Sequence, residues 1–176
     1  GGMEQVDRER SLIQFRNSSQ RTLLATDLAA RGIDIPGLDY IVHYEMPPRE
    51  EEFTHRNGRT ARMNADGSAI CIKGKNDKIP DYARGIKIKE IKAGTKIPKN
   101  KWKTLFVSGG RRDKISKGDI AGLFIKKGNL EGGELGVIEL KNDCAFVAVS
   151  SAKADDICYK LNNERLKKKK VRVRKI

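Results

Sequence analysis

Residues 93–101 divide this chain into two short halves, and the division limits what either half can fold into. The segment contains Gly94, Pro98 and three lysines and has no apolar periodicity, which is typical of a linker. Each half is long enough for one small domain, and neither is long enough for a large enzyme. We therefore predict two domains, residues 1–92 and residues 102–176.

The positive charge of the chain lies almost entirely after the first domain. Residues 1–92 hold 16 Lys and Arg against 14 Asp and Glu, and residues 93–176 hold 21 against 9, so +12 of the net +14 lies in the second part. A basic excess of this size attracts polyanions such as nucleic acid. The alternative is a well-solvated charged surface with no ligand.

The first half alternates helices and strands. Residues 4–17 have apolar positions at helical spacing, and short apolar runs at 22–26, 39–44 and 68–72 suit strands buried on both faces of a parallel sheet. Pro48 and three following glutamates predict the start of another helix. This pattern predicts an α/β layer, but three strands are few for a free-standing parallel sheet, so we expect a domain truncated at its front.

The second half has a different order of elements. Its alternating and helical patterns predict a βαββαβ arrangement, which is an α+β ferredoxin-like fold of the kind used by RNA-recognition-motif domains. The predicted elements are strand 104–108, helix 117–127, strand 135–140, strand 144–149, helix 152–162 and strand 171–175.

Two strings in the first half carry candidate chemistry: Ala25-Thr-Asp-Leu-Ala-Ala-Arg-Gly-Ile-Asp34 and His55-Arg-Asn-Gly-Arg-Thr-Ala-Arg62. Arginines three apart on a helix are most often a solvated face. On one helical turn, however, Arg59 and Arg62 could converge on a phosphoryl group and stabilise its transfer. Thr26 and Asp27 would end a parallel strand on its carboxyl side, where open α/β sheets bind ligands.

Together these strings resemble motifs V and VI of the DEAD-box RNA helicases, and Gln5-Val-Asp-Arg8 resembles the family's QxxR element. The resemblance implies a partial RecA-like helicase C-terminal core domain in residues 1–92. It implies that Arg59 and Arg62 act as arginine fingers on the γ-phosphate of ATP and that Asp34 holds the nucleotide ribose. By the same resemblance, the residues that contact RNA are Gln5, Arg8, Thr26 and Asp27, and those that couple the two sites are His55 and Arg56.

The sequence contains no GxxxxGK[ST] phosphate loop and no DEAD string. In the resembled family these lie on a first core domain, which is therefore an expected partner. We expect the full-length protein to use ATP and Mg²⁺, and this chain alone neither to bind them tightly nor to hydrolyse ATP. No metal site of its own is expected.

Two phenylalanines are expected on the open face of the second domain's sheet. Strict alternation in residues 104–108 and 144–149 sends Leu105, Val107, Ala145, Val147 and Val149 inward, and sends Phe106 and Phe146 to the other face. These rings could stack on unpaired RNA bases, as in RNA-recognition motifs. The alternative is that they pack against a linker or a terminal segment.

Basic side chains near the sheet are candidate phosphate contacts. Arg111, Arg112 and Lys114 follow the first strand, and a lysine run that includes Lys168 precedes Arg172 at the last one. Side chains of this kind neutralise RNA phosphates and make binding dependent on salt. A lysine run can equally be a solvated segment.

With residues 108–120 after its first strand, the whole chain resembles the DbpA subfamily of DEAD-box helicases. The resemblance implies binding to a hairpin of large-subunit (23S) ribosomal RNA and a role in assembling the large ribosomal subunit, with the pre-ribosomal large subunit as a partner. Two alternatives stay open: a stand-alone RNA-binding module without motor activity, and a sheet whose aromatic side chains face a protein.

The cysteines and the hydropathy indicate a cytoplasmic protein. Cys71, Cys144 and Cys158 form no CxxC pair and lie at no metal-binding spacing from histidine, so reduced thiols are expected. No apolar run reaches the roughly 18 residues of a membrane span, and no leader precedes the first domain. No membrane partner is expected.

Overall fold

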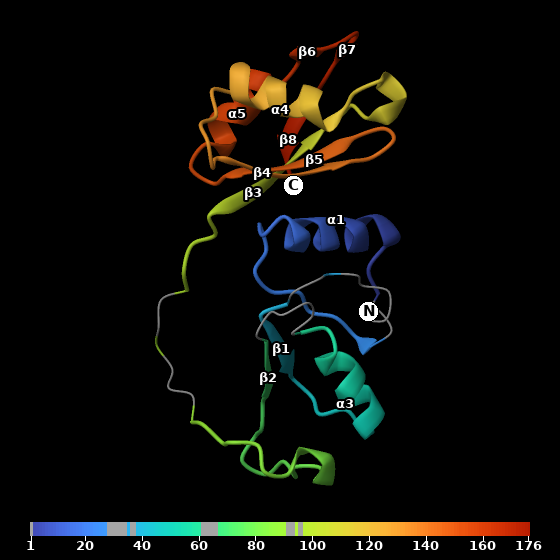
Figure 1. Ribbon diagram of the computed structural model, residues 1–176, viewed down its shortest axis with the longest axis vertical. Helices are drawn as coiled ribbons and strands as arrows, with labels where there is room; N and C mark the ends of the chain where they lie inside the picture. The colour runs from blue at the N-terminus through green and yellow to red at the C-terminus, as the bar shows by residue number, and fades with distance from the viewer. Residues whose placement is uncertain (1, 28–34, 36–37, 61–66, 91–93, 95–96) are drawn as a thin grey trace. The chain divides into compact units, whose positions relative to one another are not determined.

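The computed structural model describes residues 2–27, 35, 38–60, 67–90, 94 and 97–176. Their contacts divide the chain into two compact units. One unit is residues 25–96, and the other joins residues 1–24 to residues 97–176 (Figure 1). The second boundary falls inside the segment interpreted as a linker. The first boundary separates the opening helix from the rest of the helicase-like half, which the sequence did not suggest.

A four-stranded antiparallel sheet forms the centre of the unit that contains residues 97–176. Its strands lie in the order β4-β5-β3-β8, so the first and third strands along the chain are the central pair. Alternate side chains of these two strands, such as Leu105 and Val147, are completely buried, as the alternation predicts. The strands are Trp102–Val107 (β3), Leu135–Leu140 (β4), Ala145–Ser150 (β5) and Val173–Lys175 (β8).

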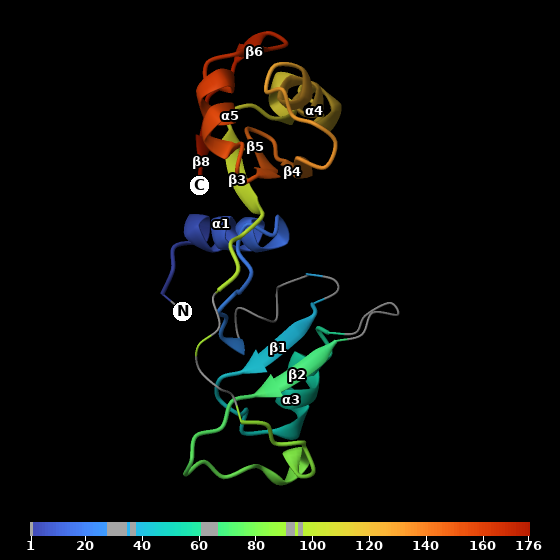
Figure 2. The same ribbon diagram turned by 90° about the vertical axis from the view of Figure 1, so that its left-hand side faces the viewer.

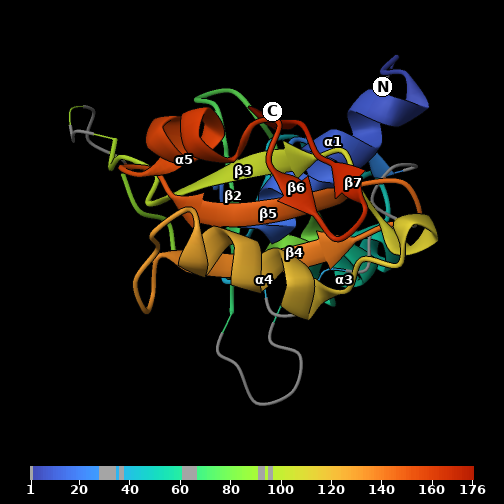
Figure 3. The same cartoon turned by 90° about the horizontal axis from the view of Figure 1, so that it is seen from above.

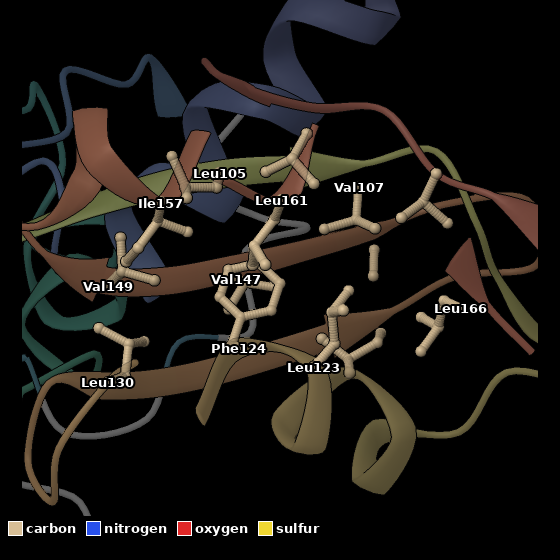
Figure 4. Packing of buried hydrophobic residues seen from close by; sticks show 14 of the residues in the cluster. Leu105, Val107, Leu123, Phe124, Leu130, Val147, Val149, Ile157, Leu161 and Leu166 are labelled. Carbon is tan, nitrogen blue, oxygen red and sulfur yellow. The ribbon is translucent and has the colours of Figure 1, made fainter. Parts of the chain in front are cut away.

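Helices α4 (Lys117–Lys126) and α5 (Ala154–Leu161) cover one face of this sheet (Figure 3). A capping box starts α4: the Asp119 amide donates to Ser116 Oγ at 3.1 Å, and the Ser116 amide donates to the Asp119 carboxylate at 2.8 Å. Phe124 of α4 is fully buried among aliphatic side chains of the sheet and of α5 (Figure 4). This arrangement confirms the predicted ferredoxin-like fold.

The lysine run near the C-terminus forms an element that the sequence did not predict. Strands β6 (Arg165–Leu166) and β7 (Lys169–Lys170) pair as a short antiparallel hairpin. Lys167 in its turn has φ 53°, in the left-handed region. Leu166 is buried in the main core and attaches the hairpin to the domain. The run is therefore an ordered basic hairpin and not only a border of the last strand.

In the unit of residues 25–96, strands β1 (Tyr40–His43) and β2 (Ser68–Cys71) pair in parallel (Figure 2). Helix α3 (Glu50–Asn57) lies between them along the chain. Its first turn holds three glutamates, which favour the positive end of the helix dipole, as predicted. Parallel strands joined through a helix confirm the α/β character of this half.

The predicted strand at residues 22–26 is wrong. Those residues have no strand conformation, and the Leu24 side chain is 91% exposed. The prediction rested on an apolar run, but a strand also needs hydrogen bonds to a neighbour, and no described strand pairs with this segment. Tyr40 and Val42 of β1 are also more than half exposed, so β1 is not buried on both faces as expected.

Helix α1 (Gln5–Arg16) forms where the sequence predicts it. It belongs to the same compact unit as residues 97–176 and lies on the face of the four-stranded sheet opposite to α4 and α5 (Figures 1 and 3). Its side chain Ile13 is completely buried. The segment that resembles the QxxR element is therefore next to the ferredoxin-like sheet.

Candidate functional site

Residues from the two singled-out strings meet in the unit of residues 25–96. The Arg56 guanidinium donates two hydrogen bonds to the Asp27 carboxylate, at 2.6 and 2.7 Å, and a third to the carbonyl oxygen of Glu45 at 3.1 Å. Paired hydrogen bonds of this kind are strong and fix both side chains in orientation. Hydrogen bonding to Asp27 also raises the pKa of Arg56, so the guanidinium stays charged.

His43 extends this contact into a buried network. It is 1% exposed at the end of β1, and its Nε2 lies 2.8 Å from Asn57 Oδ1. Because that amide oxygen can only accept, Nε2 carries the proton and Nδ1 faces the Arg56 guanidinium at 3.5 Å as an acceptor. Burial lowers the pKa of His43, which is consistent with a neutral ring. The Phe53 ring stacks on the His43 ring with the ring centres 4.8 Å apart, and the centre of the tilted Tyr82 ring lies 5.3 Å from that of Phe53.

The residues expected at the nucleotide are only partly within the described chain. Asp34 and Arg62 lie outside it. Helix α3 ends at Asn57, so Arg59 lies in the turn that follows, and the expectation that it occupies a helical turn shared with Arg62 is wrong for Arg59. Its amide donates to a carbonyl three residues back instead of four. Among the described residues, the Arg59 guanidinium has no hydrogen-bond or ion-pair partner, and its role at the nucleotide stays a prediction.

Besides Asp27 and Arg56, the residues expected to contact RNA or to couple the sites belong to two different compact units. Gln5 and Arg8 are both exposed on α1, with Arg8 Nη1 3.4 Å from Gln5 Oε1. Thr26 and His55 are exposed in the other unit. These roles stay predictions, because exposure permits a contact with RNA without identifying one.

Four outward side chains form one row across the whole ferredoxin-like sheet. In register they are Glu139 on β4, Phe146 on β5, Phe106 on β3 and Arg174 on β8. The two phenyl rings meet edge to face at 5.8 Å, and the Arg174 guanidinium lies 4.9 Å from the centre of the Phe106 ring. Both aromatic side chains point away from α4 and α5, as predicted, but the expectation that this face is open is wrong, because the N-terminal segment with α1 lies on it. Their use in stacking on bases stays a prediction. Phe146 is only 8% exposed.

The basic loops at one end of this sheet are held together by acidic side chains. Lys169 of β7 pairs with Asp113 of the turn η2 (Arg111–Asp113) at 2.8 Å, and Lys167 pairs with Asp119 at 2.7 Å. These lysines, with hydrogen bonds from the protein, lower the pKa of Asp113 and bring that of Asp119 to about 2. The lysine hairpin and the loop after β3 therefore form one continuous basic surface.

The structure divides the predicted phosphate contacts into two groups. Arg112 pairs with Asp143 at 2.9 Å, so part of its charge is already balanced. The other four have no side-chain partner among the described residues and are free to meet an anion. They are Arg111, Lys114, Lys168 and Arg172.

Sequence reasoning missed two sets of residues. His43 could have been noticed as a polar side chain at an inward position of a strand. The ion pair of Arg16 with Glu139 joins positions 123 residues apart, at 2.8 and 2.9 Å, and neither residue has a local signature. Only the packing of α1 on the sheet brings them together.

The described residues were also compared with the requirements of a membrane span, a metal site and a ligand cavity. Within the described part of the chain, no helix is long and apolar enough to cross a membrane, and no group of acidic, His and Cys side chains could hold a metal ion. Cys71, Cys144 and Cys158 are free thiols. A cavity of about 920 Å³ in residues 44–90 includes none of the predicted site residues.

Comparison with known families assigns both halves. Residues 1–64 match the model for the helicase conserved C-terminal domain, and residues 104–175 match that for the DbpA RNA-binding domain. The fold and the two matches define a helicase C-terminal domain joined to an RNA-binding domain. Over nearly its whole length, the chain is similar to the C-terminal part of DbpA-type DEAD-box RNA helicases.

Two DbpA proteins match nearly the whole chain, and a further DEAD-box helicase matches about half of it. The chain is 34% identical to the ATP-dependent RNA helicase DbpA of Escherichia coli, over 99% of this chain and 40% of that protein. It is 28% identical to the DbpA protein of Bacillus subtilis, over 99% of this chain and 43% of that protein. DEAD-box ATP-dependent RNA helicase 53 of Oryza sativa is 46% identical over 56% of this chain and 16% of its own length. The chain thus spans less than half the length of these relatives.

Proposed function

We propose that this chain works as the C-terminal part of an ATP-dependent RNA helicase. In this proposal the DbpA-type domain binds a hairpin of 23S ribosomal RNA, and the helicase core remodels neighbouring duplex during assembly of the large ribosomal subunit. The free thiols are compatible with a cytoplasmic location, which is also part of the proposal.

One observation carries the RNA-binding part of the proposal. The loop after β3, the β6–β7 hairpin and the segment before β8 present four basic side chains without side-chain partners among the described residues: Arg111, Lys114, Lys168 and Arg172. Acidic partners hold Lys167 and Lys169, so the loops are ordered before any ligand binds. A pre-ordered basic surface binds phosphates with a smaller loss of conformational entropy.

The nucleotide part rests on the first half of the chain. Bound ATP with Mg²⁺ would supply the phosphoryl group whose hydrolysis drives remodelling. Arg59 can contribute a free guanidinium to it. Arg56 in α3 is bound to Asp27, and Arg59 follows this helix in the chain. In this proposal, a movement of Arg59 when the phosphate is hydrolysed is passed through Arg56 and Asp27 to Thr26, the neighbour of Asp27. The phosphate loop and the metal ligands would come from the first core domain.

The RNA-binding proposal is tested by equilibrium binding of the 176-residue chain to a hairpin from large-subunit rRNA and to a scrambled hairpin, each at two salt concentrations. We expect a preference for the native hairpin that persists at the higher salt. Lys168→Ala should weaken binding to both RNAs and reduce the salt slope by about one. Lys78→Ala, the same charge change in the other unit, is the matched control. Equal affinities that fall together with salt would contradict the hairpin assignment.

The motor proposal needs the full-length protein. Arg59→Ala or Arg62→Ala should abolish most ATP turnover while leaving the affinity for the hairpin almost unchanged, because the substitutions lie outside the RNA-binding domain. Arg49→Ala is the control, since Arg49 is an exposed arginine at the start of the same helix and its side chain pairs with Glu52. Normal turnover in both variants would remove the arginine-finger roles. Stand-alone RNA binding would be favoured if the full-length protein showed no RNA-stimulated ATP hydrolysis.

A further inference from the structure

The four consecutive lysines of the β6–β7 hairpin have two different kinds of surroundings. Lys169 binds Asp113 at 2.8 Å, and Lys167 lies 2.7 Å from a second carboxylate. The other two members of the run, Lys168 and Lys170, are exposed and have no side-chain partner among the described residues. Alternate lysines of the run are therefore bound to the domain, and the ones between them are free.

The pairing of the two short strands explains this division. Leu166 lies opposite Lys169 in the register, so both side chains are on the same face of the β6–β7 hairpin. Leu166 is buried in the core, which makes this the face that meets the rest of the domain. Arg165 and Lys170 form the other opposite pair, and both are exposed on the outer face.

The backbone holds both acidic partners in place. Asp113 accepts a hydrogen bond from the Gly110 amide at 3.1 Å, and Asp119 accepts one from the Ser116 amide at 2.8 Å in the capping box of α4. The two aspartate side chains are only 25% and 27% exposed. The β6–β7 hairpin is thus attached to two fixed points, one after β3 and one at the start of α4.

Few other contacts keep the β6–β7 hairpin in position. Its ladder has two residue pairs, and so short a ladder is not stable by itself. Of residues 165–170, all of which the structure describes, only Leu166 is buried. Lys167 in the turn also donates a hydrogen bond to the carbonyl oxygen of Lys114. Without the two carboxylates, the mutual repulsion of the lysines would be opposed mainly by one apolar side chain.

We propose that Asp113 and Asp119 are positioning residues for RNA binding, and that they increase the affinity for RNA although they carry the same charge as its phosphates. Each aspartate holds one lysine as an anchor, and the anchored β6–β7 hairpin presents Lys168 and Lys170 to the phosphates. The inference rests on the proposed RNA binding and adds which lysines contact phosphate. Net charge alone predicts the opposite sign, because removing an acidic side chain strengthens the attraction for a polyanion.

The positioning role is tested first without RNA, by ¹⁵N relaxation of the backbone amides of residues 165–170 in the 176-residue chain. Asp113→Asn combined with Asp119→Asn should make these amides mobile on the nanosecond timescale, because both ion pairs are lost. Asparagine keeps a side-chain oxygen that can accept from the same backbone amides, so the turn and the helix cap are retained. Asp155→Asn combined with Asp156→Asn, which removes two ion-paired carboxylates from α5, is the matched control and should leave the β6–β7 hairpin ordered. An equally ordered β6–β7 hairpin in the first variant would overturn the proposal.

The affinity for RNA is then measured with the native and scrambled rRNA hairpins at one salt concentration. The variant with Asp113→Asn and Asp119→Asn should bind about fivefold more weakly than the wild type, as expected for the loss of two partly exposed ion pairs. The α5 control has the same net charge and should bind at least as tightly as the wild type. Tighter binding by the first variant would overturn the proposal.

A charge-neutral exchange separates positioning from net charge. Asp113→Asn combined with Lys169→Gln removes one charge of each sign, so it should restore wild-type affinity if only net charge matters. A positioning pair predicts that this variant binds as weakly as Asp113→Asn alone, and restored affinity would overturn the proposal. Lys170→Gln should instead lower the salt slope by about one, and an unchanged slope would overturn its assignment as a phosphate contact.

The proposed function can fail separately from this inference. Equal binding of the wild type to the native and scrambled hairpins would remove the proposed rRNA specificity. Both RNAs offer phosphates, however, so the direction of the change in affinity caused by Asp113→Asn still decides whether the aspartate is a positioning residue.

Discussion

The two halves of this chain are stabilised by different kinds of interaction. Of the 21 buried hydrophobic side chains among the described residues, 19 lie in residues 102–176, and one, Ala83, lies in residues 25–96. The latter region instead relies on the polar contacts among Asp27, Arg56, His43 and Asn57. An apolar core depends mainly on shape and volume, whereas a buried polar network depends on charge state and on every partner being present. The stability of residues 102–176 should therefore depend mostly on the volume of core side chains, and that of residues 25–96 mostly on charge and hydrogen-bond partners.

The largest expected effect comes from removing a core aromatic side chain. Phe124→Ala should destabilise residues 102–176 by about 3–5 kcal/mol, because the ring is fully buried and leaves a cavity. Phe53→Ala, the matched change in α3, should cost only about 1 kcal/mol, because the ring is partly exposed. Urea unfolding followed by hydrogen exchange in each region measures both. Similar losses in the two regions would show that residues 25–96 have more apolar stabilisation than the comparison allows.

A smaller change in stability is expected from glycine substitutions in residues 102–176, and it tests how tightly the loop at Gly110 is packed. A Cβ at Gly110 would lie 2.3 Å from the Asn142 carbonyl oxygen, so Gly110→Ala must displace the backbone and should cost about 1–3 kcal/mol. Gly122→Ala, in the middle of α4 with no atom within 4 Å of the new Cβ, should instead stabilise the domain by about 0.5–1 kcal/mol. Thermal unfolding of both variants gives the sign directly. An unchanged unfolding temperature for Gly110→Ala would mean that the backbone at residues 141–142 moves aside at little cost in free energy.

The smallest effect concerns pH. Because burial lowers the pKa of His43 in the folded state, protonation favours the unfolded state. The stability of residues 25–96 should therefore be unaffected above the unfolded pKa of about 6.5 and should fall as the pH drops below it towards the folded value. Hydrogen exchange in residues 40–57 between pH 7.5 and 5.5 measures this loss. His43→Gln should abolish the pH dependence, whereas His55→Gln, at an exposed position, should not.

Local patterns predicted the ferredoxin-like half well. The bounds of β4 were correct at both ends, and the inward positions of β3 and β5 are buried as predicted, although Thr104, Phe146 and Ala148 on the other face are buried as well. Regular alternation and a capping box act over a few residues, so they can be read without the rest of the chain. The segment 22–26 shows the limit, since its apolar residues resemble a strand that no described neighbour pairs with.

The sequence by itself determined the linker before residue 102, the basic character of the segment after it, the motif strings and the side of the sheet on which Phe106 and Phe146 lie. Only the tertiary structure decided that α1 lies on the aromatic face, that Arg56 pairs with Asp27, and which basic side chains remain free. The reason is the separation along the chain between the residues that interact. Periodicity, capping and composition are set by residues within a few positions, whereas ion pairs between distant segments depend on a packing geometry that no local pattern records.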